Sequence, residues 1–209
     1  GSDVNERNTD GNTPLLSLTS NWNYEETTVI KQLLLAGANV NEKTDYGSTP
    51  FGLALAFKNN KQILKILLEN GADVKLDGQG GEFVTNSNLH TAASLLWDTE
   101  ILQLIIDEGL DVNILGVNGQ TPLHNVIVSQ TAISQGFGAD SYNTVKFLLE
   151  KGADASIKDD FGLTALDWTS DEIVKEKITT EIIHLLQMSS QTKKSNWPKS
   201  ELKKDFLFS

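Results

Sequence analysis

The 209-residue sequence contains no cysteine. This absence excludes disulfide frameworks and thiolate metal sites, and it favours a reducing compartment, so we expect a cytoplasmic location. No apolar run approaches the roughly 18 residues that a membrane-spanning helix requires, so we expect no membrane association. Apolar residues still make up 39% of the chain, and 16 glycines accompany them. That ordinary apolar share predicts a folded protein rather than a disordered one.

Basic residues are scarce as well. The sequence has 17 Lys and Arg against 28 Asp and Glu, a net charge of −11. The charge is uneven, because residues 187–209 carry five lysines and two acidic residues, whereas the remainder has 12 basic and 26 acidic residues. An acidic body repels phosphate backbones, so we expect a neutral or basic protein partner and no nucleic acid.

The motifs of common active sites are missing too. The sequence has no Gly-x-x-x-x-Gly-Lys phosphate loop, no nucleophile elbow and no paired metal-ligand spacing. The glycine-rich residues 78–81 precede no lysine and follow no strand pattern, which favours a flexible loop. Asp159 and Asp160 do not open a twelve-residue calcium loop. We therefore expect no enzymatic activity, no metal and no cofactor.

Two phrases recur along the chain. One runs Leu-Leu-x-x-Gly-Ala-Asp, with variations, and places its glycine at Gly37, Gly71, Gly109 and Gly152. The other reads Gly-x-Thr-Pro-Leu, again with variations, and contributes Thr13, Thr49, Thr121 and Thr164. In three cases the threonine follows the preceding phrase glycine by 12 residues, a constant interval that argues against chance.

The two phrases have the chemistry of helix boundaries. Threonine is a favoured N-cap and proline suits the first helical position, so Thr-Pro predicts a helix start. Glycine after Leu-Leu-x-x predicts a helix end, because it adopts the left-handed conformation without Cβ strain. Between them lie apolar residues at helical spacing, such as Ile63, Ile66 and Leu67. One such helix pair cannot bury its apolar face alone, so we expect neighbouring pairs to stack.

The combined pattern resembles the ankyrin repeat, whose motif is Thr-Pro-Leu-His-x-Ala followed by Leu-Leu-x-x-Gly-Ala-Asp-Val-Asn. The resemblance covers roughly residues 3–186. It implies an all-α solenoid of stacked helix-turn-helix units with projecting hairpin or loop fingers. We expect one domain over 3–186, with repeats near 8–41, 42–75, 80–113, 114–156 and 157–186. Residues 3–5 match the tail of a preceding repeat, so we expect sequence upstream.

Three departures from the motif carry expectations of their own. The third repeat has four extra residues before Ser87, which predicts a long finger loop at 76–83. The fourth has nine extra residues, which fit between its two helices within 129–141. The fifth opens a helix at Thr164 but lacks the closing glycine phrase, so we expect it to cap the array. The basic tail, 187–209, is expected to hold a short helix that packs on this last repeat.

The histidines His90 and His124 occupy the same position of their repeats. A metal pair is one interpretation, but neither has the neighbouring ligands that zinc needs. The resemblance implies instead a hydrogen-bonded histidine that braces the adjacent turn. We therefore assign structural roles to both histidines, as to the recurring glycines and threonines named above.

The resemblance implies that a partner binds at the finger tips and on the concave surface of the first helices. Counted back from each threonine, the projecting positions include Lys43, Asp45, Tyr46, Phe83, Leu115, Val117, Asn118, Asp160 and Phe161. Their apolar members predict a row along one edge, the mark of an interaction site. The alternative is that the fingers pack on one another and hide about half of that row. Trp22 and Trp97 fall in inter-helix turns that border the groove, where binding and packing remain equal alternatives, whereas Trp168 is expected to pack.

These observations favour a monomeric, non-enzymatic protein–protein interaction module. The alternative is a targeting domain of a larger enzyme or toxin whose catalytic part lies outside this sequence. A third hypothesis is a secreted effector of an intracellular bacterium. Its basis is an Asn-, Lys- and Ile-rich composition and a polar tail that ends in residues 206–209 with late hydrophobic positions, similar to type IV secretion signals.

Overall fold

The computed structural model describes residues 3–20, 27–57, 60–76, 86–95, 99–131 and 139–169, together with 172, 175–176, 178–180 and 183–184. In these ranges the regular elements are helices, and extended backbone pairs in one isolated bridge, between Lys158 and Thr164. No helix in the described part of the chain has the length and apolarity needed to cross a membrane. The expected all-α class is confirmed.

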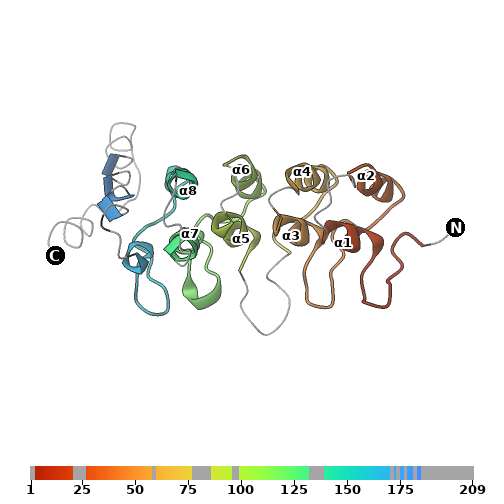
Figure 1. Cartoon of the computed structure of the whole chain (residues 1–209), viewed down its shortest axis with the longest axis horizontal. Helices are drawn as coiled ribbons and strands as arrows, with labels where there is room; N and C mark the ends of the chain where they lie inside the picture. The colour runs from red at the N-terminus through yellow and green to blue at the C-terminus, as the bar shows by residue number, and fades with distance from the viewer. Residues whose placement is uncertain are drawn as a thin grey trace.

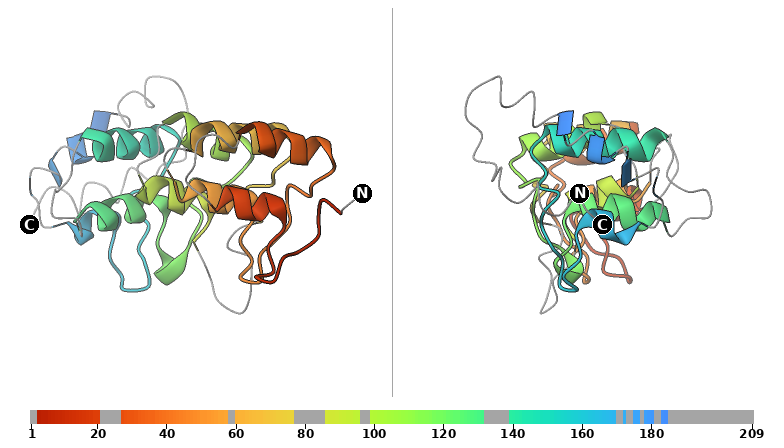
Figure 2. Two further views of the ribbon diagram at one scale, coloured as in Figure 1. Left: turned by 45° about the vertical axis from the view of Figure 1, so that its right-hand side comes forward. Right: turned by 90° about the vertical axis from the view of Figure 1, so that its left-hand side faces the viewer.

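The helices form two parallel rows (Figure 1). One row contains the first helices of the repeats, α1 (Pro14–Thr19), α3 (Pro50–Leu55), α5 (Asn88–Ser94) and α7 (Pro122–Thr131). The other contains the second helices, α2 (Thr27–Leu35), α4 (Lys61–Glu69), α6 (Thr99–Asp107) and α8 (Ala139–Glu150). The two rows run side by side along the length of the array (Figure 2). This stacking of helix pairs is the solenoid that the repeated phrases predict.

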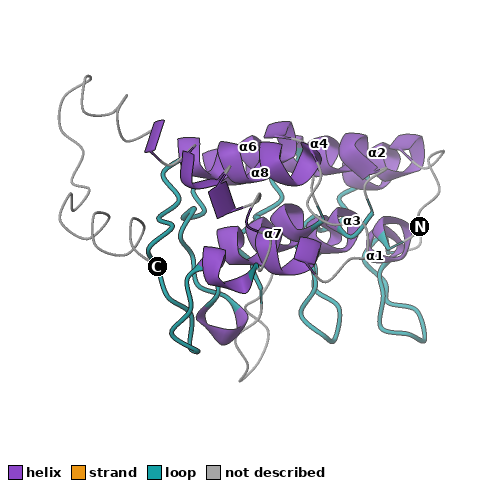
Figure 3. Ribbon diagram, turned by 60° about the vertical axis from the view of Figure 1, so that its left-hand side comes forward, coloured by secondary structure: helices purple, strands orange, loops and turns teal. Residues whose placement is uncertain are grey.

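Loops project from the first-helix row on the side away from the second row (Figures 1 and 3). We number these fingers by the repeat that they introduce. The described fingers are finger 1 (6–12), finger 2 (42–48), finger 4 (114–120) and finger 5 (157–163). The long loop expected at 76–83 lies almost entirely outside the described residues.

Helix starts follow from the Thr-Pro phrase. Thr13 and Thr49 adopt extended backbone, and each side-chain oxygen accepts a hydrogen bond from the third helical amide, Leu16 at 3.3 Å and Gly52 at 3.2 Å. Proline at the next position has no N–H to leave unsatisfied. The same cap therefore begins both α1 and α3.

Helix ends follow from the glycine phrase. Gly37, Gly71, Gly109 and Gly152 all have positive φ, between 83° and 94°. After Gly71, the Ala72 N–H donates to Leu67 O at 3.0 Å, and the Gly71 N–H donates to Leu68 O at 3.0 Å. Carbonyls that α4 would leave unsatisfied are thereby bonded.

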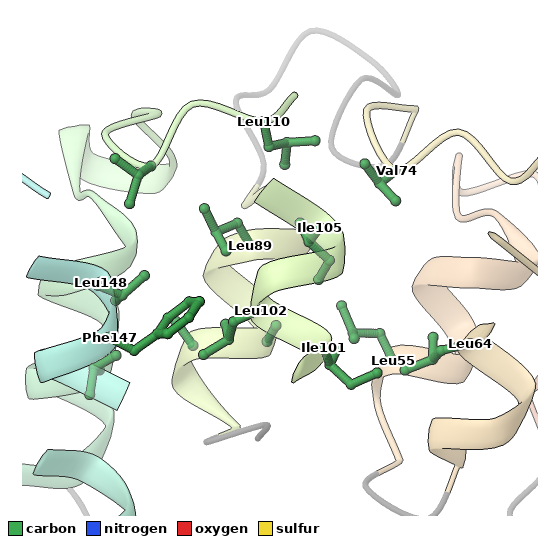
Figure 4. Close-up of a cluster of buried hydrophobic side chains, with 14 of the residues drawn as sticks. Leu55, Leu64, Val74, Leu89, Ile101, Leu102, Ile105, Leu110, Phe147 and Leu148 are labelled. Atoms are coloured by element: carbon green, nitrogen blue, oxygen red, sulfur yellow. The ribbon is translucent and has the colours of Figure 1, made fainter. Parts of the chain in front are cut away.

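A single apolar core runs between the rows. Figure 4 shows its central part, where Leu55 and Leu64 from one repeat face Ile101 of the next, and Leu102 approaches Phe147 of α8. These five side chains are buried. Each repeat therefore buries its apolar face against its neighbours, as a solenoid requires.

Two details differ from the expectations. Part of the insertion expected between the helices of the fourth repeat is helical, because α7 runs to Thr131 and α8 begins at Ala139. The first helix of the fifth repeat is a 3₁₀ turn, η4 (Ala165–Trp168), rather than an α-helix. Asp167 accepts from the Thr164 N–H and so caps the start of this turn, but Thr169 already has extended backbone, so the turn ends at Trp168.

Candidate protein-interaction surface

Fingers 1 and 2 are joined by Arg7. Its guanidinium donates to Gly11 O at 2.6 Å, within its own finger. Across to finger 2 it donates to Glu42 Oε1 at 2.5 Å and to Lys43 O at 2.7 Å, and it lies 3.5 Å from Asp45 Oδ1. One planar cation therefore holds two neighbouring loops in register. Sequence reasoning did not assign Arg7 this role.

Fingers 4 and 5 are joined through the backbone. The Asp160 N–H donates to Asn118 O at 3.0 Å. Asn118 has a φ of 58°, within the 3₁₀ turn η3 (Val117–Gly119), and Gly119 follows with a φ of 68°. A Cβ on Gly119 would lie 2.6 Å from Asp160 Oδ1 and 3.2 Å from the Asp160 backbone nitrogen, and the positive φ would strain any side chain there.

Finger 5 is built around a buried carboxylate, Asp159. Its Oδ1 accepts from the amides of Phe161 and Leu163, each at 3.0 Å, and its Oδ2 accepts from the Trp168 indole N–H at 2.7 Å. Burial alone would raise the pKa of Asp159, but hydrogen bonds from Leu163, Trp168 and other donors outweigh it and lower the pKa. The carboxylate thus stays ionised and rigidifies the finger. The sequence shows the acid but not its burial.

Trp168 packs, as expected, partly buried against the core. Its ring also meets Phe161 edge-to-face, with centroids 6.0 Å apart. The aromatic residue at the tip of finger 5 is therefore supported from behind by a second ring.

The two histidines connect α5 and α7 to the fingers that follow these helices. His124 Nδ1 lies 2.8 Å from Thr121 Oγ1 and accepts from the Thr121 N–H at 3.2 Å, while Nε2 donates to Leu163 O at 3.2 Å. His90 makes the same bonds with Ser87 and with Gln120 O. These positions serve the fold, and no group of three or more His, Cys, Asp or Glu able to hold a metal occurs within the described ranges.

Four of the apolar residues predicted at projecting finger positions are described, and all four are exposed. Tyr46 is 92% exposed, Phe161 62%, Leu115 56% and Val117 40%. Asp45, Asn118 and Asp160 are exposed beside them, whereas Lys43 is half-buried because its ammonium donates to Leu76 O at 2.9 Å. Packing between fingers has not hidden these four side chains. Phe83, Trp22 and Trp97 lie outside the described residues.

The described fingers together form a surface suited to binding a protein. It presents rigid loops with apolar and aromatic tips and acidic neighbours, on a scaffold of capped helices. Such a surface can bury apolar side chains of a partner and pair with its cations.

Comparisons with known proteins agree with this architecture. The family model described as ankyrin repeats (3 copies) matches residues 1–77, and a second model, described as ankyrin repeat, matches residues 118–160. The repeat expected at 80–113 lies between these matches, where the structure has α5 and α6.

Relatives share the repeats at modest identity. The chain is 30% identical over 187 residues to the E3 ubiquitin-protein ligase KEG of Arabidopsis thaliana, covering 83% of this chain and 10% of the ligase. It is 29% identical over 189 residues to the ankyrin repeat protein FPV031 of fowlpox virus, covering 87% of this chain and 50% of that protein. With Rabankyrin-5 of Mus musculus it shares 32% identity over 138 residues, 64% of this chain and 11% of Rabankyrin-5.

The chain spans half or less of the length of each of these relatives. Ankyrin repeats are generally non-catalytic modules of protein–protein interaction, and the capped helix pairs and projecting fingers described above are built on their motif. By its matched motifs and its architecture, the chain belongs to the ankyrin repeat family.

Proposed function

We propose that the chain binds a neutral or basic protein partner through its finger tips and the adjoining surface of the first helices. The observation that carries this proposal is the exposure of Tyr46, Leu115, Val117 and Phe161, all at projecting positions of the fingers. Exposed apolar side chains that recur at equivalent loop positions lose water on contact with a partner, which favours binding.

Fingers 1, 2 and 5 are also held in place before any partner arrives. Arg7 holds finger 2 beside finger 1, and Asp159 holds the loop that carries Phe161. A loop that is already in its binding conformation loses less entropy when it binds. This preorganisation supports the fingers as the contact surface rather than as mere connections.

Charge supports the choice of partner. The chain carries a net charge of −11, and exposed carboxylates stand next to two of the apolar tips, Asp45 beside Tyr46 and Asp160 beside Phe161. Complementary charge speeds association and discourages acidic competitors. The partner surface should therefore combine apolar side chains with lysine or arginine. We propose that the chain itself acts as a monomer.

The test is affinity capture from cells of the source organism with three versions of the chain. The first is the wild-type chain. The second carries Tyr46→Ser, Leu115→Ser and Phe161→Ser together. The third carries Leu35→Ser, which removes a side chain that is 88% exposed on α2 and distant from the fingers. Quantitative mass spectrometry then compares the captured proteins.

A specific partner should be retained by the wild-type chain and by Leu35→Ser, and lost from the finger variant. Matching circular dichroism and melting temperatures must show that all three versions fold. Partners that remain with the finger variant, or that disappear equally from Leu35→Ser, would contradict binding at the finger tips.

A second candidate function is that this module targets a larger protein. The chain covers only 10% of the Arabidopsis ligase and 11% of Rabankyrin-5, which supports a role as one part of a longer polypeptide. An antibody against residues 3–169 tests this on an immunoblot of native extract. A band near the 22.9 kDa of this chain would contradict the larger protein, as a much larger band would support it. The bacterial-effector hypothesis rests on the tail, which lies outside the described residues.

A further inference from the structure

Fingers 2 and 5 end in turns with the same hydrogen bonds. The Gly47 N–H donates to Thr44 O at 2.9 Å, and the Gly162 N–H donates to Asp159 O at 2.9 Å, so each finger closes a four-residue turn. Thr44 Oγ1 and Asp159 Oδ1 each accept from the amide four positions further on, at 3.1 Å and 3.0 Å. The two turns therefore present their two central residues in equivalent ways.

An aspartate and an aromatic residue occupy the central positions of both turns. Finger 2 has Asp45 followed by Tyr46, and finger 5 has Asp160 followed by Phe161. All four side chains are exposed. The corresponding pairs in fingers 1 and 4 are Thr9–Asp10 and Val117–Asn118. Among the described fingers, the combination of a carboxylate and an aromatic ring thus occurs twice, at the same place in the turn.

The preceding finger leaves room for each of these aspartates. A Cβ on Gly11 would lie 2.7 Å from Asp45 Oδ2, and a Cβ on Gly119 would lie 2.6 Å from Asp160 Oδ1. Each carboxylate occupies space that a side chain on the neighbouring finger would need. The contact between fingers therefore helps to position the carboxylate next to the aromatic residue that follows it.

The two carboxylates differ in their charged neighbours. Asp45 Oδ1 lies 3.5 Å from the Arg7 guanidinium, although the Asp45 side chain is still 76% exposed. The three shorter bonds of that guanidinium go to other acceptors. In the described part of the chain no residue forms an ion pair with the Asp160 carboxylate. Finger 5 therefore offers the less compensated negative charge.

We propose that fingers 2 and 5 each bind one arginine side chain of the partner. The guanidinium pairs with the aspartate and lays its flat face on the aromatic ring. A guanidinium makes both contacts at once because it is planar, charged and weakly hydrated. Finger 5 binds more tightly, because Arg7 offsets part of the charge of Asp45. A partner with two arginines spaced to reach both fingers gains affinity from both contacts. This inference rests on the proposed function and adds the residue type that the partner presents.

The experiment is an NMR titration of the isotope-labelled full chain with the capped tripeptide acetyl-Gly-Arg-Gly-amide. Amides of fingers 2 and 5 should show saturable shifts, and those of finger 5 should saturate at the lower concentration. The same tripeptide with citrulline keeps the shape of arginine without its charge and should produce no saturable shifts. The tripeptide with lysine should bind more weakly at both fingers, since an ammonium lacks the planar face.

Three variants locate the contacts. Asp160→Asn should weaken binding at finger 5 by about fivefold and leave finger 2 unchanged. Phe161→Leu keeps an apolar side chain but removes the ring, and should weaken binding at finger 5 by about threefold. Asp10→Asn is the matched control, because it removes an exposed carboxylate from the turn of finger 1, which has no aromatic neighbour. It should change binding at neither finger.

Three results would overturn the arginine sites. The first is equal binding of the arginine and citrulline tripeptides, and the second is equal binding of the arginine and lysine tripeptides. The third is a loss in Asp10→Asn as large as that in Asp160→Asn, which would mean that net charge alone attracts the peptide. If these results appear while partner capture still depends on the finger tips, the arginine sites are wrong and the proposed function stands. A captured partner that ignores the finger variants, although the tripeptide binds as expected, would contradict the proposed function alone.

Discussion

The imidazole of His90 donates from Nε2 to the carbonyl oxygen of Gln120 at 2.9 Å, although the two residues are 30 positions apart. On its other side the ring accepts the Ser87 N–H at Nδ1, so the neutral tautomer with a proton on Nε2 satisfies both contacts. Burial lowers the pKa of His90 and of His124, more strongly than their backbone hydrogen bonds raise it. The folded array therefore requires both rings neutral.

This requirement predicts acid sensitivity. Below the ordinary histidine pKa of 6.5, the unfolded chain takes up protons that the folded chain refuses, so stability falls as the pH drops through that value. Urea denaturation midpoints measured from pH 8 to pH 5 should decline. A matched variant, His90→Gln, should be less stable by about 1–3 kcal/mol at pH 8 and should show a shallower decline. A flat profile in the wild-type chain would contradict the neutral-ring account.

The lowered pKa of Glu100 should make the stability of the fold depend on pH in a second range, more acidic than that of the histidines. Hydrogen bonds from Lys61 and Lys65 lower its pKa from 4.5 to about 2. A carboxylate with a lowered pKa stabilises the fold fully above 4.5 and loses that contribution as the pH falls toward 2. Glu100→Gln should therefore narrow the stability difference between pH 5 and pH 3 without changing the slope between pH 8 and pH 6. NMR titration of the Glu100 carboxyl measures the pKa directly, and an ordinary value would contradict the contacts with Lys61 and Lys65.

A side chain at Gly71 should lower the stability of the fold through its backbone conformation alone, without a steric clash. Its φ is +83°, yet nothing lies within 4 Å of where a Cβ would be. The cost of a side chain is therefore conformational alone, and Gly71→Val should lower stability by about 1–3 kcal/mol. Gly71→Asn should lose less, since asparagine tolerates left-handed backbone. Thermal melts that show equal losses for valine and asparagine would contradict this explanation.

The buried carboxylate of Asp159 should stabilise the fold, and its replacement by an amide tests this. In Asp159→Asn the amide must place an N–H group against either the Trp168 indole or the two backbone amides, so we expect a loss of about 1–3 kcal/mol. Asp160→Asn is the matched control, because Asp160 joins finger 4 through its backbone N–H and its side chain is exposed. Differential scanning calorimetry compares the two. Equal melting temperatures for both variants would show that the buried carboxylate contributes nothing.

Much of this fold could be read from the sequence because its determinants are local. Thr13 and Thr49 begin helices through bonds to amides three residues away, and Gly37 and Gly71 end them through their own φ. Such rules act within one turn of helix, so the recurring phrases predict them. The exposed finger positions were also accessible, since they follow by counting from each threonine.

What sequence reasoning missed depends on contacts between elements. The burial of Asp159 depends on Trp168, nine positions later, and the role of Arg7 depends on a loop 35 positions away. A 3₁₀ turn at Ala165–Trp168 stands where a helix was expected, because the backbone is already extended at Thr169. Lys75 did leave a visible signal, because lysine stands where three other copies of the phrase have Asn5, Asn41 and Asn113. Only the structure shows that those asparagines donate to a glycine carbonyl of the next repeat.

The central claim, that a partner binds at the finger tips, is tested most directly by site-specific photo-crosslinking. A photoreactive phenylalanine analogue replaces Phe161 in one sample and Leu35, exposed on α2, in another, and each is irradiated in cells of the source organism. The account predicts a discrete crosslinked protein from position 161, reduced when Tyr46 and Leu115 are also serine, and none from position 35. Crosslinks to the same protein from position 35, with none from position 161, would place the partner on the second-helix surface and contradict the account.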